Sequence, residues 1–172
     1  MLPTQPDLLL QVEKLVERLQ NSTLIEDRRG ACRALRSLSR KYRVEVGAQG
    51  MDALMSVLTM DRTDNEIVTY ALESLLNITQ PEPLEDEDPN MPPMGKQFTE
   101  ILTKKTENVQ SLLSVLDEYD FRVRLPGIKL MTNLLRNRPK DIQETLLVSP
   151  MGISKLVDLL SDSREVVRNE VS

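Results

Sequence analysis

The feature that most constrains the fold of this chain is a leucine-rich phrase that occurs four times. The phrase begins at residues 15, 54, 112 and 156, where the sequence reads LVERL, LMSVL, LLSVL and LVDLL. The middle interval is longer than the other two because it contains an acidic, proline-rich insert at residues 80–95. Without the insert, all three intervals are close to 40 residues, which is typical of proteins built from stacked helical units. The spacing therefore predicts a helical solenoid.

A second phrase follows the first three occurrences and predicts a second helix in each unit. It reads ALRSL from residue 34, ALESL from residue 71 and LMTNL from residue 130. Short amphipathic stretches precede three of these helix pairs, at residues 44–48, 98–104 and 142–148. They predict the additional first helix that distinguishes armadillo units from HEAT units. We therefore expect an all-α, armadillo-type right-handed superhelical solenoid of about three to four repeats, with one long acidic loop.

The expected repeats form a single armadillo-like domain over residues 1–172. The units span 7–42, 43–79, 96–138 and 139–172, the last of them incomplete. The composition agrees, because the apolar share is 40%, aromatic residues make up only 3% and Trp is absent, a bias that suits helices packed on helices. Thr23 with Glu26 predicts a capping box for the helix that follows.

The insert at residues 80–95 is expected to be a disordered loop that projects from the solenoid. It holds five prolines and five acidic residues but no basic residue, a composition that cannot join a packed layer. We interpret it as a solvated insertion, with an acidic docking segment as the alternative. Outside the insert the charges balance, whereas a nucleic-acid-binding protein would carry a clear basic excess. Nucleic-acid binding is therefore not expected.

The residue types that most enzymes require are scarce. The chain has no histidine and a single cysteine, Cys32, so zinc sites, catalytic triads and internal disulfides are not expected. Cys32 is expected to be a buried, inert thiol. The glycines do not cluster into a phosphate-binding loop, and neither a signal peptide nor a membrane-spanning run is present. We expect a cytosolic protein that is not an enzyme and has no cofactor.

An arginine row is the first candidate binding surface. Arg29, Arg33, Arg36 and Arg40 fall on one face of a helix, opposite the apolar face. Guanidinium groups bind carboxylates in a bidentate manner, so the row suits an acidic segment of a partner protein. The alternative is a solvated helix face whose long side chains cover apolar surface.

The second candidate surface is the groove that the third helices of armadillo units line. In armadillo proteins this groove carries a Trp and, four residues later, an Asn. Here the Trp position holds Arg33, Tyr70 and Lys129, and the Asn position holds Ser37, Ser74 and Asn133. Only Asn133 keeps the armadillo residue, so the peptide clamp of nuclear import receptors is not expected. The two surfaces together make nine candidate partner-binding residues: Arg29, Arg33, Arg36, Ser37, Arg40, Tyr70, Ser74, Lys129 and Asn133.

Several stretches resemble the N-terminal head domain of general vesicular transport factors, the coiled-coil tethers of Golgi traffic. They include DRRGACRALRSLSRKYRVEVGAQ from residue 27, PGIKL from 126, LVSPMG from 147 and DSREVVRN from 162. The resemblance implies a cytoplasmic protein, peripheral at Golgi and transport-vesicle membranes, that tethers vesicles in ER-to-Golgi and intra-Golgi transport. It implies a Rab-family GTPase, golgins and SNARE proteins as partners. Members of the family form homodimers through a coiled coil that this sequence does not include.

Two other functions remain open from the sequence. One is a generic armadillo adaptor that binds acidic peptides, and the other is a peripheral membrane-surface module, for which more aromatic residues would be expected. At the C-terminus, the helix that begins near Ser163 stops at Ser172, which suggests a truncated isoform or a gene-model fragment. We therefore expect four apolar residues of the last unit to be poorly covered: Leu156, Leu159, Leu160 and Val167.

Overall fold

The computed structural model describes residues 5–149 together with 152, 154, 155, 157, 158 and 161. All regular elements in this part of the chain are helices, which confirms the all-α prediction. Eight of them have defined bounds: α1 (Gln5–Asn21), α2 (Ile25–Ser39), α3 (Arg43–Met60), α4 (Asn65–Ile78), α5 (Met94–Thr103), α6 (Thr106–Val115), α7 (Phe121–Asn137) and α8 (Pro139–Val148).

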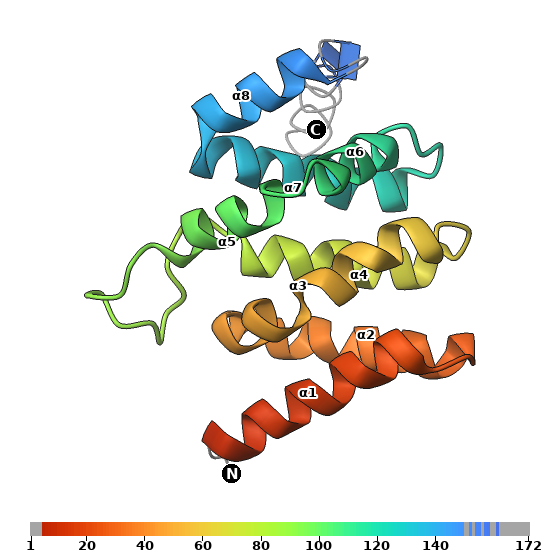
Figure 1. Cartoon of the computed structure of the whole chain (residues 1–172), viewed down its shortest axis with the longest axis vertical. Coiled ribbons are helices and arrows are strands. Elements are labelled where there is room, and N and C mark those ends of the chain that lie inside the picture. The colour runs from red at the N-terminus through yellow and green to blue at the C-terminus, as the bar shows by residue number, and fades with distance from the viewer. Residues whose placement is uncertain (1–4, 150–151, 153, 156, 159–160, 162–172) are drawn as a thin grey trace, which may run out of the picture.

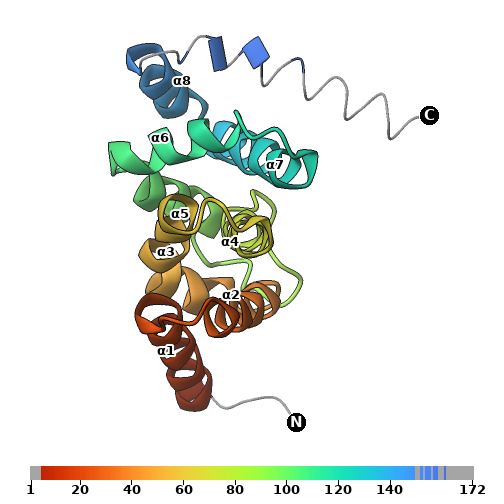
Figure 2. The ribbon, with the colours of Figure 1, turned by 90° about the vertical axis from the view of Figure 1, so that its right-hand side faces the viewer.

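The helices form two stacked columns, which confirms the solenoid. Helices α1, α3 and α6 lie in one column and α2, α4 and α7 in the other, with α5 and α8 on the side of the first column (Figure 2). Within the second column α2 packs on α4 and α4 on α7, while α1 contacts α3 and α3 contacts α6 in the first. The stack runs from α1 at one end to α8 at the other (Figure 1). Each unit therefore buries the apolar face of the next.

The two leucine-rich phrases supply the core between the columns. Leu54 and Leu58 of the first phrase and Leu72 and Leu75 of the second are fully buried. They belong to one apolar cluster that continues from α1 to α8. Cys32 lies in the same cluster, and burial raises the pKa of its thiol to about 12. The expectation that Cys32 is buried is confirmed, and its raised pKa agrees with an unreactive thiol, which stays a prediction.

The additional first helix is present in the third and fourth units but not in the second. Residues 98–104 and 142–148 fall largely within the separate helices α5 and α8, as predicted, whereas residues 44–48 are the start of the continuous 18-residue helix α3. The prediction of a separate helix there is wrong. A break would need extended backbone, such as that of Lys105 before α6, whereas α3 runs on through Gly47. The Phe98 ring occupies the space that a side chain at position 47 would fill.

The predicted capping box at Thr23 is also wrong. Helix α2 begins one residue later than expected, with Leu24 as its N-cap and no side-chain cap. Glu26 is then the second helical residue, not the third that a capping box requires. Side-chain caps are found instead at α4, where Asp64 accepts a hydrogen bond from the Ile67 N–H, and at α7.

The expectation for the C-terminal unit lies outside the described residues, because Leu156, Leu159, Leu160 and Val167 are not among them. Of the helices that the structure describes, none has both the length and the hydropathy that a membrane span requires.

Candidate partner-binding face

Eight of the nine predicted binding residues lie on α2, α4 and α7, the column of third helices, and the ninth, Arg40, is the C-cap of α2. We call the solvent-facing side of these three helices the third-helix face. Arg33, Ser37, Arg40 and Lys129 are exposed on it, and Ser74 is buried. The other four are half-buried: Arg29, Arg36, Tyr70 and Asn133. The structure thus brings the residues onto one side of the stack but does not expose them equally.

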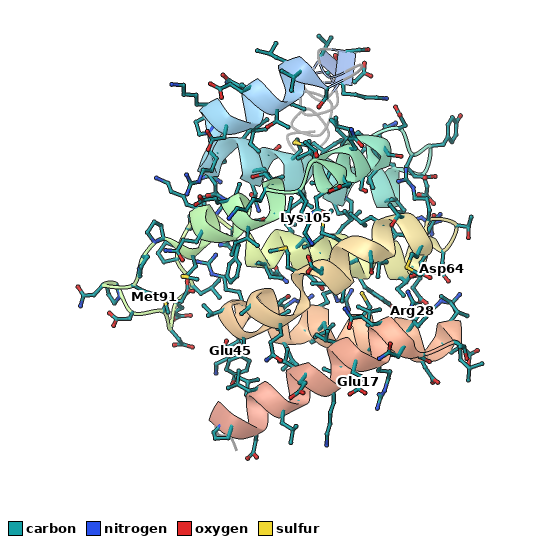
Figure 3. The ribbon with its side chains drawn as sticks, viewed as in Figure 1. Glu17, Arg28, Glu45, Asp64, Met91 and Lys105 are labelled. Atoms are coloured by element: carbon teal, nitrogen blue, oxygen red, sulfur yellow. The ribbon has the colours of Figure 1, made fainter. Side chains whose placement is uncertain are left out.

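Arg29 is engaged by acidic residues of the next unit. Its Nε donates to Asp64 Oδ2 at 2.8 Å and lies 3.3 Å from Glu66 Oε2. Asp64 caps α4 at the same time. Asp64 lies at the edge of the stack, where α4 begins, near Arg28 (Figure 3). Arg29 therefore ties α2 to the start of α4 and has little capacity left for a partner.

Arg36 is engaged in the same way, one helical turn beyond Arg33. Its Nη1 donates to Glu73 Oε2 at 2.9 Å, and its guanidinium lies 4.6 Å from the centre of the Tyr70 ring. This stacking adds a cation–π contact to the ion pair. Two of the four arginines of the row are thus used inside the molecule. The side chains of Arg33 and Arg40 have no hydrogen bond or ion pair with any described residue.

The residues at the armadillo Asn positions also differ in their availability. Ser74 Oγ donates to the Tyr70 carbonyl oxygen at 2.8 Å, within α4. Asn133 Nδ2 donates to the Leu76 carbonyl oxygen at 3.2 Å and lies 3.5 Å from Thr79 Oγ1. These contacts connect α7 to α4. Asn133 therefore stabilises the stack and Ser74 is buried within it, which leaves Ser37 as the exposed residue at this position.

The sequence did not single out Arg43, which anchors the acidic insert. Its side chain is only 2% exposed. Its Nη2 and Nε lie 2.6 and 3.0 Å from the two carboxylate oxygens of Glu87, and its Nη1 donates to the Gln80 carbonyl oxygen at 2.7 Å. A buried guanidinium requires such a partner. The sequence did contain a signal for this role, because Arg43 falls on the buried face of α3.

The two ends of the insert meet at Asn137. Its Nδ2 lies within hydrogen-bond distance of three oxygens: the carbonyl of Thr79 at 2.7 Å, the carbonyl of Gly95 at 3.1 Å and Thr99 Oγ1 at 2.9 Å. The loop projects from this neck to the side of the stack, and Met91 lies within it (Figure 3). These contacts hold the neck and Glu87 against the solenoid, whereas the mobility of the rest of the insert stays a prediction.

The acidic partners of these arginines have lowered pKa values. Burial raises the pKa of Asp64, but hydrogen bonds from Arg29 and the Ile67 N–H outweigh it, so the pKa lies below its usual range. The pKa of Glu87 is lowered in the same way, because the hydrogen bond from Arg43 and its positive charge outweigh burial. Both carboxyl groups therefore stabilise the fold only while they are ionised.

We expect the protein to lose stability in acid. Besides Asp64 and Glu87, Asp120 has a pKa of about 2, chiefly because of its hydrogen bond from Arg122. Groups with a lower pKa in the folded state bind fewer protons there, so their contribution is complete above about pH 4.5 and is lost as the pH falls through the folded pKa. Urea unfolding at a series of pH values should show a constant free energy from about pH 7 to 5 and a steady fall below that. Stability that is unchanged or higher at about pH 3 would contradict this assignment.

Among the described residues, no group of three or more His, Cys, Asp or Glu side chains is placed to hold a metal ion. The third-helix face is thus a surface of helix side chains, with Arg33, Ser37, Arg40 and Lys129 as the exposed members of the predicted set. Such a surface can bind another protein through charged and polar contacts.

Comparison with known proteins gives consistent results. No protein-family model matches the chain. The chain is 53% identical over 163 residues to the Homo sapiens general vesicular transport factor p115, an alignment that covers 92% of this chain and 17% of that protein. It is 36% identical over 162 residues to Golgin candidate 6 of Arabidopsis thaliana, with 92% of this chain and 18% of that protein covered. The chain thus spans less than a fifth of the length of these relatives.

A solved structure shows the same arrangement of helices. The crystal structure of Uso1-2 superposes with a TM-score of 0.80 at 26% sequence identity, over 99% of this chain and 29% of that one. Sequence identity and fold agree along nearly the whole chain. The resemblance found in the sequence is therefore confirmed, and the chain belongs to the family of general vesicular transport factors.

Proposed function

We propose that this chain is a protein-binding scaffold, the head segment of a vesicle tethering factor that acts in ER-to-Golgi and intra-Golgi transport. The observation that carries the proposal is the 53% identity to a protein described as a general vesicular transport factor, over 92% of this chain. The fold supports a binding role, because a solenoid buries its repeat interfaces and offers its long exposed faces to other proteins.

The proposed partners are a Rab-family GTPase, golgins and SNARE proteins. Through them the chain would be held at Golgi and transport-vesicle membranes as a peripheral protein, without contacting lipid itself. The third-helix face is the proposed contact surface, since it carries the exposed side chains Arg33, Ser37, Arg40 and Lys129. Exposed arginines are common at the centres of protein interfaces.

The test is direct binding of purified proteins to the immobilised chain. A panel of Rab-family GTPases, each loaded with a GTP analogue or with GDP, and the cytosolic segments of golgins and SNAREs serve as analytes. We expect at least one GTPase to bind in the GTP-analogue form and not in the GDP form. Liposomes containing anionic lipid, tested alone, should not bind. Binding to liposomes without any captured protein would support the membrane-surface alternative and contradict the proposal.

A second candidate function is an adaptor for acidic peptides. The observation that favours it is the pair of exposed arginines, Arg33 and Arg40, that lack an acidic partner among the described residues while their neighbours Arg29 and Arg36 each have one. The adaptor function differs from the tethering function because it requires only a short acidic segment of the partner protein.

A further inference from the structure

A small hollow lies on the third-helix face between α2 and α4. Its volume is about 260 Å³, and its lining consists of Glu26, Arg29, Gly30, Arg33, Glu66 and Tyr70. We propose that this hollow, which we call the Arg33 hollow, is a binding site for one Asp or Glu side chain of a partner protein. The inference rests on the proposed protein-binding function and names the chemistry that one part of the face recognises.

The charges in the lining leave one cation unpaired. Arg29 lies against Asp64 and 3.3 Å from Glu66, and Glu66 also accepts a hydrogen bond from the Tyr70 hydroxyl at 3.3 Å. The negative charge of Glu26 also acts on Arg29. The Arg33 side chain has neither an ion pair nor a hydrogen bond with any residue that the structure describes. Its guanidinium therefore keeps its full capacity to bind a carboxylate with two parallel hydrogen bonds.

The shape of the hollow depends on Gly30 and Tyr70. Gly30 is inside α2, where glycine is less favourable than alanine. Packing does not require a glycine there, because a Cβ at this position would have no atom within 4 Å. The bare backbone thus leaves one side of the hollow open. The Tyr70 ring forms another side and is held by the Arg36 guanidinium 4.6 Å from its centre.

A carboxylate fits this hollow better than a more highly charged group. The lining contains two carboxylates of its own, Glu26 and Glu66, which repel a doubly charged phosphate about twice as strongly as a singly charged carboxylate. The single negative charge of an Asp or Glu side chain matches Arg33, the one cation of the lining without a partner. The hollow is also open to solvent along Gly30, so a side chain from an extended or helical segment can enter it without any movement of α2 or α4.

The test uses a blocked hexaglutamate peptide as the probe and the isotope-labelled full chain, followed by NMR. We expect the largest shift changes at the Gly30 amide and at Arg33 and Tyr70. Changing Arg33 to Gln, or filling the hollow with Gly30→Leu, should weaken binding at least about fivefold. The matched control is Arg18→Gln, which removes an exposed arginine of α1, outside the third-helix face, and should change the affinity less than about twofold.

Two outcomes would overturn the proposal. One is the absence of shift changes at Gly30 and Arg33. The other is an equal loss of binding in Arg33→Gln and Arg18→Gln, which would show only general attraction between the acidic peptide and surface cations. Because the probe is neither a GTPase nor a golgin, a failure of the tethering proposal leaves this result unchanged. The peptide could bind, and lose affinity in Arg33→Gln and Gly30→Leu as expected, while no trafficking protein is captured. That result would refute the tethering function but support the Arg33 hollow as a binding site.

Discussion

Replacing Arg43 with alanine is expected to lower the free energy of unfolding by about 3 kcal/mol, because it removes one partner of a buried ion pair. The guanidinium, 2% exposed, binds both carboxylate oxygens of Glu87 and the carbonyl oxygen of Gln80. Without it, the largely covered Glu87 carboxylate and the Gln80 carbonyl lose their donors, and α3 keeps a cavity. Urea unfolding followed by far-UV circular dichroism measures the loss.

The matched control for Arg43 is Arg136→Ala, which breaks a second ion pair between the solenoid and the same insert. Arg136 and Glu82 are both more than half exposed, and exposed pairs contribute little to stability. We therefore expect no measurable change in the urea midpoint. Hydrogen exchange adds a local measurement, since the Leu84 amide donates to Glu87 and should lose protection in Arg43→Ala. Equal effects of the two substitutions would show that Arg43 is not the anchor of the insert.

Two glycine-to-alanine substitutions are expected to change stability in opposite directions. Gly95→Ala should lower the free energy of unfolding by about 2 kcal/mol, because the added methyl group overpacks the neck of the insert. A Cβ on Gly95 would overlap the Gln80 carbonyl oxygen and lie 3.1 Å from the Thr79 carbonyl oxygen. Gly30→Ala should raise it by about 0.5 to 1 kcal/mol, because alanine is the better helix former and the site has open space.

Thermal and urea unfolding of the two variants next to the unmodified chain measure this difference. Both glycines are helical, so helix propensity alone would make both alanines stabilising. A stabilised Gly95→Ala variant would therefore mean that the neck opens at little cost. A destabilised Gly30→Ala variant would mean that the Arg33 hollow is not empty space in solution, and the argument from its shape would fail with it.

The units of the solenoid could be predicted because each repeat carries its own local information. The phrases around Leu54 and Leu72 set the periodicity, and each of these leucines is buried in a helix that the pattern predicted. What the pattern could not show is where the chain continues as a single helix. Residues 44–48 are amphipathic whether or not a break follows. In the structure α3 continues through Gly47, and Phe98, from beyond the insert, packs against this glycine.

The candidate site was predictable only in part, for a physical reason. Helical periodicity places Arg29, Arg33 and Arg36 on one face, and the structure agrees. Which of them is neutralised depends on the register between α2 and α4, since the acids that pair with Arg29 and Arg36 lie 35 and 37 residues further along the chain. No local pattern specifies that register. It emerges from the packing of two apolar faces, and it leaves Arg33 between two occupied neighbours.

The closed neck of the insert has a consequence for how this chain can vary. The chain leaves the solenoid at Thr79 and returns at Gly95, and one amide, that of Asn137, contacts both carbonyl oxygens. Lengthening a loop whose ends already meet adds only a small, logarithmic entropy of closure. The number of residues between the second and third units is therefore uncoupled from the distance between these units. The insert can be lengthened or shortened while the stack of helices stays in register, as long as Glu87 remains to pair with Arg43.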